Sequence, residues 1–299
     1  MPMTFAKVHS AGSDHIVVNQ AQSTPADLPS VARRFCPQRA GVGAIGLAVF
    51  AHQGYSRFVI RYFGPDGKEF RADGNALRCC ARVINLQYGY RTAALITEGG
   101  VHDFDVLGDN VGVCFPSPGD LTGPFVAQRR RLYGIRTGGD NIVMFTEDVD
   151  SIDLGTQESV IRNSSSAAMS SARINFVEIF GAASLRLRTF DCTVGAEAMS
   201  NDNGALAAAV VARRIGLCRQ ENIEVQTGSG CSLTVPADCG PGESSWLYGP
   251  ASFCFSGELP ALASRPAPVI QPCHACLTIW PRIRGRNDAT TKLPDRCQR

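Results

Sequence analysis

The sequence predicts an α+β protein of two similar lobes, each with β-strands around one central helix. First, residues 71–84 and 200–214 both run from a turn-forming segment into a helical apolar pattern, and Asp-x-x-Ala-Leu occurs in both, at Asp73–Leu77 and Asp202–Leu206. Second, short segments of alternating apolar and polar residues lie before and after each helix. Third, Pro116–Asp120 resists regular pairing. We therefore predict an N-terminal lobe over 1–117 and a C-terminal lobe over 118–254.

The composition is that of a soluble protein that binds small molecules. The 299 residues, 32.0 kDa, suffice for two domains of ordinary size. With 44% hydrophobic and 19% charged residues and a net charge of +2, the chain offers no electrostatic case for binding nucleic acid or a membrane. No apolar stretch is long enough to cross a bilayer, and residues 1–7 lack the layout of a signal peptide. We expect a cytoplasmic protein.

The cysteines predict packing rather than disulfides. The chain has 12 cysteines, and most of them lie in apolar patterns, where a thiol behaves as a small buried hydrophobe. Examples are Cys79, Cys80, Cys114, Cys218 and Cys254.

The elements of the first half follow one another closely. Residues 4–19 predict a strand pair around a polar bend that carries Ser13, Asp14 and His15. We then expect a helix over 26–35, strands over 45–50 and 56–63, and a tight turn at 65–67. The first central helix begins near Asn75 and ends near Gly89. Strands over 93–108 and 111–115 complete the lobe.

The second half has a similar order. Strands are predicted over 143–145, 174–180 and 185–190, with a flexible polar loop over 164–171. The second central helix follows, and then strands over 223–227 and 232–235 around a Gly-rich turn. For residues 255–299 we predict a returning strand and a partly disordered tail, since the part beyond 260 is rich in Pro, Arg and Cys and lacks sustained periodicity.

The tail contains the nearest approach to a metal site in the sequence. Cys273 and Cys276 form a single Cys-x-x-Cys, with Cys297 further on. Without a second pair this is weak evidence for zinc, so we predict no metal. Arg282, Arg284 and Arg286 are better explained as a solvated surface than as a binding patch.

The two helix N-termini are the candidate site. We call residues 73–75 the first N-terminus and residues 201–204 the second N-terminus. The N-terminus of a helix gathers unpaired N–H groups and the positive end of the helix dipole. Two of them that face each other would hold an anionic group between them. We therefore predict a ligand cleft between the lobes.

Several motifs, in order and spacing, resemble those of diaminopimelate epimerase. They are Phe5–Asn19, Gly41–Leu47, Phe63–Gly67, the two helix N-termini, Arg173–Glu178 and Leu247–Leu259. The resemblance covers about residues 3–259. It implies two pseudo-symmetric lobes, each a curved and mostly antiparallel sheet around a central helix, and it is compatible with a homodimer.

The chain departs from that family where the chemistry takes place. In the family each helix N-terminus opens with a catalytic cysteine, and the matching residues here are Asp73 and Asn201. The family's Glu-Arg, which binds the substrate, falls within Asp191–Gly195. A one-residue ambiguity leaves Cys192 or Thr193 at the Arg position, and neither can hold a carboxylate.

Other site motifs are altered as well. The family's Gly-Asn-Asp-Phe becomes Gly12–His15, one polar Asn becomes Gly64, and Gly-Asn-Pro-His becomes Gly138–Asn141. The polar or glycine site positions that still match are Gly74, Asn75, Asn175 and Glu197. The resemblance therefore implies the fold, and we do not predict diaminopimelate epimerisation.

We predict a cofactor-independent isomerase or cyclase in which Asp73 moves a proton of a small carbonyl- or carboxylate-bearing metabolite. The internal repeat aligns Asp202 with Asp73, whereas the family alignment places Asn201 at the second thiol position. We favour Asp202 as the acid/base partner, with Asn201 and backbone N–H groups stabilising an enolate-like oxygen. Phenazine-pathway isomerases of the same fold use carboxylate proton transfer, which supports this by analogy. The predicted substrate-binding residues are Ser13, His15, Gly74, Asn75, Asn175, Glu197, Asn203 and Gly204.

Two alternatives stay open. Aspartate is a preferred N-cap, so capping explains either Asp73 or Asp202 taken alone. Likewise His15 is either a general acid or base or a histidine packed where the family has Phe. The alternative function is a catalytically inert epimerase-like protein that acts in binding or assembly.

Overall fold

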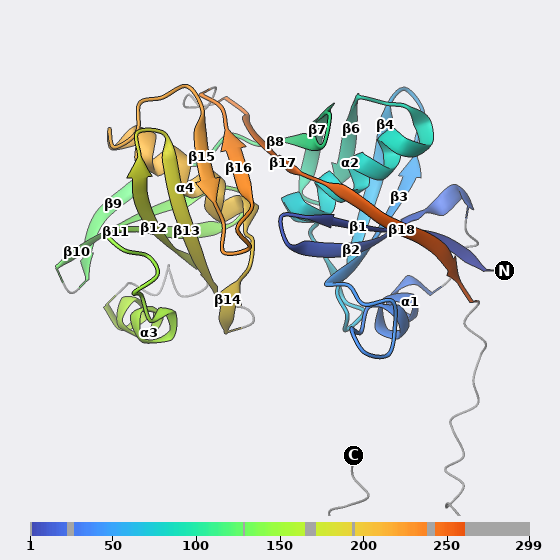
Figure 1. Ribbon diagram of the computed structural model, residues 1–299, viewed down its shortest axis with the longest axis horizontal. Coiled ribbons are helices and arrows are strands. Elements are labelled where there is room, and N and C mark those ends of the chain that lie inside the picture. Colours follow the sequence, from blue (N-terminus) through green and yellow to red (C-terminus); the bar gives the residue numbers. More distant parts are fainter. Residues whose placement is uncertain are drawn as a thin grey trace, which may run out of the picture. The chain divides into compact units, whose positions relative to one another are not determined.

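The computed structural model describes residues 2–22, 27–127, 129–164, 172–192, 195–237 and 243–260. These residues belong to one compact unit, Met1–Leu262. Predictions for Thr193, for most of the loop 164–171 and for the tail with its cysteines and arginines lie outside the described residues. The expected α+β class is confirmed, with two lobes of mostly antiparallel sheet that each surround one helix (Figure 1).

The N-terminal lobe is built around helix α2 (Gly74–Tyr88). Its other elements, in chain order, are β1 (Met3–Ser10), β2 (Ser13–Asn19), η1 (Gln20–Gln22), α1 (Leu28–Phe35), β3 (Gly46–His52), β4 (Arg57–Phe63), β5 (Glu69–Phe70), β6 (Thr92–Thr97), β7 (Gly100–Leu107) and β8 (Asn110–Phe115). Helix α2 packs against β1, β2, β3, β7 and β8, while α1 packs against β4.

The C-terminal lobe is built around helix α4 (Asp202–Arg214). Its other elements are β9 (Thr122–Ala127), β10 (Arg130–Arg136), β11 (Asp140–Thr146), α3 (Leu154–Ser164), β12 (Arg173–Gly181), β13 (Ser184–Asp191), β14 (Ala196–Ala198), β15 (Ile223–Gln226) and β16 (Ser232–Val235). Helix α4 packs against the sheet from β10 to β16, mainly on β11, β12 and β13 (Figure 1).

Strand pairing shows that the lobes repeat one another. In the first lobe β1 and β2 are antiparallel, β2 and β3 parallel, β3 and β4 antiparallel, and β4 and β6 parallel. In the second lobe β10 to β13 and β15 have the same pairings in the same order. A helix makes the crossover at each equivalent place, α1 or α3 and then α2 or α4. The Asp-x-x-Ala-Leu echo in the sequence therefore reflects a repeat of the fold.

Local sequence explains where α2 begins and ends. Asp73 has extended backbone, and its side chain accepts a 2.8 Å hydrogen bond from the N–H of Ala76, which makes it the N-cap. At the other end Gly89 has φ +75°, and its N–H donates to the carbonyl of Asn85. Both signals stand in the sequence, and the predicted helix agrees with α2 to within a residue.

The last two described strands return to the first lobe. Strand β17 (Ser245–Pro250) pairs with β8, and β18 (Ser252–Leu259) pairs with β1. The return begins at Ser245, earlier than the predicted third segment at 255. Pro116–Asp120 contains no helix or strand, as expected of a linker, and the lobe boundaries themselves stay a prediction.

The interior consists of three apolar clusters. The largest surrounds both α2 and α4, and two smaller ones lie under α1 and α3. Cys79, Cys80 and Cys218 are buried as predicted, and burial raises the pKa of Cys80 to about 12. Cys114 is half-buried, but Cys254 is exposed, so its predicted burial is wrong. The cause is that, within the described residues, β18 has β1 as its one partner strand and most of its length faces outward.

Candidate functional site

The first N-terminus presents an acidic side chain at the surface. Asp73 is exposed, and as the N-cap of α2 it accepts the bond from Ala76 described above. Gly74 and Asn75 begin the helix and are buried. The first N-terminus therefore carries a carboxylate that caps α2 and also reaches solvent.

The second N-terminus is arranged differently. Asn201 is the N-cap position of α4, but its side chain makes no capping hydrogen bond, and its amide nitrogen is buried without a hydrogen-bond partner among the described residues. Asp202 is the first helical residue and is 2% exposed. A shift of one residue thus turns the acidic side chain of the second N-terminus inward.

Asp202 forms a buried ion pair with Arg78 of the opposite helix. Nη1 of Arg78 donates to Oδ2 of Asp202 at 2.5 Å and Nη2 donates to Oδ1 at 2.9 Å, so the pair is bidentate. The side chains of Arg78 and Asp202 are 0% and 1% exposed. This pair links α2 to α4, and the amide of Asn75 adds a 3.5 Å bond to Ser200. The two helix N-termini therefore meet, as predicted.

Other groups complete the surroundings of Arg78. Its Nε donates to Oγ of Ser10 at 2.9 Å, and Nη2 also donates to Oδ1 of Asn75 at 2.6 Å. A Cβ added at Gly249 in β17 would lie 3.3 Å from Cζ of Arg78, so the returning strand encloses the guanidinium. Each nitrogen of Arg78 has a partner, and the arginine connects the N-terminus of α2, strand β1 and the second lobe.

The ion pair bears on the predicted role of Asp202. Burial raises the pKa of Asp202, and Arg78 opposes that rise. Since arginine keeps its proton in proteins, Asp202 is the counter-charge that Arg78 needs and is ionised at neutral pH. Both carboxylate oxygens are engaged by the guanidinium. In this geometry Asp202 is a structural anion, whereas the sequence suggested a free acid/base group.

Below the first N-terminus lies a pair of buried aromatic side chains. His15 in β2 is 0% exposed, and neither ring nitrogen has a hydrogen-bond partner among the described residues. Its ring centroid is 5.7 Å from that of Tyr62, whose phenol crosses over Gly46, where a side chain would clash. Burial lowers the pKa of His15 and raises that of Tyr62, and the charge of Asp73 acts on both. His15 is therefore a neutral imidazole close to Asp73.

Below the second N-terminus the buried groups are amides and hydroxyls, and those of Asn175 and Thr189 are hydrogen-bonded. Asn175 donates to Oδ1 of Asn141 at 3.1 Å and accepts from Oγ1 of Thr189 at 2.8 Å. Its side chain lies against Gly204, where an added Cβ would clash with it. Asn203 accepts a 2.7 Å bond from Thr137 at its carbonyl, while its own side-chain oxygen is buried without a described partner. These residues hold the start of α4 in place.

The remaining predicted residues lie further from the helix contact. Ser13 is buried at the turn after β1, where it pairs with Ser10. Gly12 in the same turn packs against Ser229 of the second lobe. Glu197 forms two 2.8 Å bonds with Arg188, which lower its pKa. Glu197 is thus held within its own lobe.

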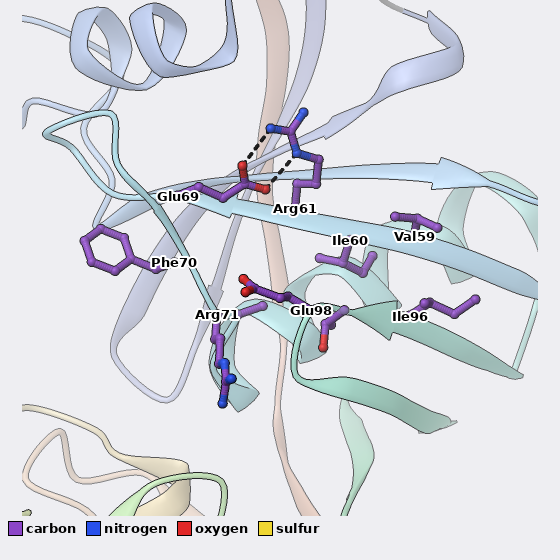
Figure 2. Close-up of a pocket in the computed structure, with 10 residues that line it drawn as sticks. Val59, Ile60, Arg61, Glu69, Phe70, Arg71, Ile96 and Glu98 are labelled. Atoms are coloured by element: carbon purple, nitrogen blue, oxygen red, sulfur yellow. Dashed lines mark hydrogen bonds and ion pairs between the residues drawn. The ribbon is translucent and has the colours of Figure 1, made fainter.

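Two pockets occupy equivalent places in the repeat. The first, about 300 Å³, lies where β4 separates from β6 and is lined by Ile60, Arg61, Glu69, Phe70 and Glu98 among others (Figure 2). The second, about 270 Å³, lies where β13 separates from β15 and includes Leu187, Arg188 and Glu197. Each has a bidentate Arg–Glu pair on its wall, and Figure 2 shows that of Arg61 and Glu69. The first pocket reaches Arg71 and Ala72, next to Asp73.

Sequence reasoning missed two residues of the site. Arg78 lies four residues after Gly74 on a helix, where an arginine is usually on the solvated face, and its burial depends on β17 and the second lobe. Tyr62 lies in an ordinary alternating strand. The signal that could have found Tyr62 is Gly46, which leaves room for the phenol above a buried strand.

The sequence relatives of the chain are epimerases, which places it among isomerase-type enzymes and identifies its family. The chain is 31% identical over 271 residues to the diaminopimelate epimerase of Methanothrix thermoacetophila, covering 83% of this chain and 93% of that protein. It is 29% identical to that of Moorella thermoacetica, covering 86% and 99%. This chain belongs to the diaminopimelate epimerase family. No protein-family model matches it.

Solved structures share the fold at low sequence identity. A phenazine biosynthesis protein of the PhzF family from Bacillus anthracis superposes with a TM-score of 0.64 at 13% identity, covering 87% of this chain and 99% of that one. A hydroxyproline epimerase from Agrobacterium vitis gives 0.58 at 13% identity, covering 86% and 91%. The chain thus shares its architecture with a phenazine biosynthesis protein and with a hydroxyproline epimerase.

Among the described residues no three His, Cys, Asp or Glu side chains come together as a metal site. No helix in the described part of the chain has the length and apolar character needed to span a bilayer.

Proposed function

We propose that the chain is a cofactor-independent isomerase or cyclase in which Asp73 transfers a proton of a small carbonyl- or carboxylate-bearing metabolite. One observation carries the proposal. Asp73 is exposed at the N-terminus of α2. Burial is the main cause of the pKa shifts of His15, Tyr62 and Asp202, and the charge of Asp73 also acts on each of these groups. An accessible carboxylate beside a buried neutral imidazole is a suitable pair for moving a proton.

His15 is the better second proton-handling group in this proposal. Asp202, the partner that the sequence favoured, uses both oxygens for Arg78. His15 has both ring nitrogens unpartnered among the described residues, and burial lowers its pKa, so its ring is neutral and offers a nitrogen that can accept a proton. Asn201, whose buried amide nitrogen has no described partner, and N–H groups of the second N-terminus would stabilise the negative oxygen of an enolate-like intermediate. This chemistry needs no cofactor.

Solvent deuterium exchange tests the proposal without a known substrate. The protein is incubated in D₂O with a panel of small ketones, keto acids and dienes, and deuterium at carbon is measured by mass spectrometry. We expect Asp73→Asn to lower incorporation by about 100-fold or more. Because Asn also caps helices well, the fold should be retained. Asp27→Asn, which changes the exposed N-cap carboxylate of α1 in the same way, serves as the matched control and should keep full exchange.

The second candidate is a binding protein without chemistry. It is favoured by the Arg78–Asp202 pair, which fills part of the space where the two helix N-termini meet. On this alternative the wild type and Asp73→Asn give the same, background incorporation for each compound that the protein binds. That result would overturn the isomerase proposal.

A further inference from the structure

The anion-binding end of α2 is already occupied by a carboxylate of the same chain. Gly74 is the first residue of α2, and a Cβ added there would clash with Oδ2 of Asp202 and lie 2.8 Å from its Cγ. The carboxylate of Asp202 therefore lies directly against the start of the opposite helix. Helix N-termini attract anions because their N–H groups are unpaired and the dipole is positive there.

The charge of this carboxylate is fully balanced. Arg78, the buried cation nearest to it, binds both of its oxygens, and the other nitrogen contacts of Arg78 go to Ser10 and Asn75. Asp202 and Arg78 are both almost fully buried. Asp73, the acidic residue of the first N-terminus, adds a second carboxylate at the surface. Both oxygens of Asp202 and each nitrogen of Arg78 are therefore already engaged.

We propose that Asp202 is a built-in replacement for the carboxylate that a substrate would otherwise place between the two helix N-termini. A carboxylate of the substrate would be a second anion beside a guanidinium that is already paired with Asp202, and the like charges would repel it. The substrate is therefore an uncharged carbonyl compound at its reacting end, such as a ketone, an ester or an amide. This substrate class rests on the proposed function, whereas the occupied anion site does not.

Chemical rescue by acetate tests the occupied site. Asp202→Gly removes the side chain of Asp202 beyond Cα, that is, a methylene and a carboxylate, and acetate has the same size. Because the variant leaves Arg78 buried and unpaired, we expect its Tm to fall by about 5–15 °C. Added sodium acetate should restore at least half of that loss in a saturable manner, while sodium chloride at equal ionic strength should not. No rescue by acetate overturns the proposal.

Two controls separate rescue from a general salt effect. Asp202→Asn keeps the volume but not the charge, so acetate cannot enter and should not raise its Tm. Asp150→Gly removes a carboxylate that pairs with Arg186 at the surface, where the two side chains are 71% and 40% exposed, and acetate should have no effect on it. Rescue of either variant to the same extent as Asp202→Gly would contradict a specific site.

A measurement on the wild type covers the case in which Asp202→Gly does not fold. The amide resonances of Gly74, Asn75 and Asn203 are followed by NMR while acetate is added to the wild-type protein. We expect no saturable shift, because Asp202 already fills the site. A saturable shift of these amides would show a free carboxylate site and would overturn the proposal.

These results are independent of the isomerase proposal. Acetate rescue with no loss of deuterium exchange in Asp73→Asn would keep the occupied site and reject the catalytic role of Asp73. In the opposite case, exchange depends on Asp73 and is fastest with carboxylate-bearing compounds, and acetate rescues no variant. That result would keep the catalytic role of Asp73 and reject the occupied site.

Discussion

The two helix N-termini occupy equivalent places in a repeated fold, yet they use their acidic residues in opposite ways. At the first, Asp73 is the N-cap, bonds to its own helix and stays exposed. At the second, the carboxylate stands one residue later, at Asp202, and bonds to Arg78 of the other helix in the interior. The comparison teaches that a shift of one residue decides whether a carboxylate caps its helix or joins two lobes.

The strands that pack against the two central helices also differ in the side chains that they place under each helix N-terminus. In the strand pairs below them, Ala48 lies opposite Tyr62 in the first lobe and Asn175 lies opposite Thr189 in the second. The first lobe therefore has buried aromatic side chains under its helix, Tyr62 and His15, and His15 has no described hydrogen-bond partner. The second lobe has hydrogen-bonded polar side chains in the same place. The proton-transferring groups of the proposed function, Asp73 and His15, both belong to the first lobe.

The largest expected effect comes from the ion pair between the lobes. Arg78→Met leaves Asp202 as a buried, unpaired charge and should lower the free energy of unfolding by about 3–5 kcal/mol, measured by urea denaturation. The double variant Arg78→Met/Asp202→Leu removes both charges and should recover most of that loss. A double variant as unstable as Arg78→Met would show that the cost is not electrostatic.

The next effect depends on pH through His15. Because burial lowers the folded-state pKa of His15, the unfolded chain takes up its proton first as the pH falls. The stability contributed by neutral His15 is present above about pH 6.5 and is lost below it, down to the folded pKa, by up to about 1.4 kcal/mol per pH unit. His15→Phe should flatten this part of the stability curve relative to wild type.

The difference between the pH profiles of wild type and His15→Phe isolates the contribution of His15 from those of other titrating groups. Asp73 and Asp14 raise the pKa of His15, and Lys7 and Arg78 lower it, each less than burial does. His102, which is also buried with a lowered pKa, remains in both proteins and cancels in the difference. An unchanged slope in His15→Phe would mean that His15 does not lose a proton on folding.

A smaller effect compares the two N-caps directly. Asp73→Ala removes the bond to the N–H of Ala76 and should cost about 1 kcal/mol of stability. Asn201→Ala removes no capping bond and should cost less than half as much. Both are measured by thermal unfolding, and equal losses would contradict the difference between the two helix ends.

The smallest effect concerns the repeated Arg–Glu pairs. Glu69→Gln and Glu197→Gln each weaken one bidentate pair on a pocket wall, and both should change stability by less than about 1 kcal/mol because these pairs reach solvent. The larger of the two losses is expected for Glu197. Its pair is 23% and 34% exposed, against 48% and 43% for Arg61 and Glu69. The reverse order, measured by urea denaturation, would contradict burial as the cause.

Elements with strong local signals could be predicted from the sequence, and others could not. Helix α2 has a cap, an apolar face and a terminal glycine, so its bounds were predicted closely. Strands β9 and β10 and helix α3 were not predicted. Strand β9 is mostly exposed and lacks alternation, and α3 is a mostly polar segment that buries only a few residues, such as Leu154 and Ile161, in its own small cluster.

The candidate site shows the same division. Asp73 and the paired helix N-termini could be identified from turn chemistry and the internal echo. The roles of Arg78 and Tyr62 could not, because each depends on a residue distant in sequence, Asp202 for the arginine and His15 for the tyrosine.

The sequence by itself determined the α+β class, the two central helices and the acidic residue at each N-terminus, because caps, glycines and apolar periodicity are local properties. Only the tertiary structure decided that Asp202 faces Arg78 and that Asp73 stays exposed. The physical reason is that burial and charge pairing depend on which surfaces the returning strands bring together. Strands β17 and β18 close the second half of the chain onto the first, and that contact turns a surface arginine into a buried partner.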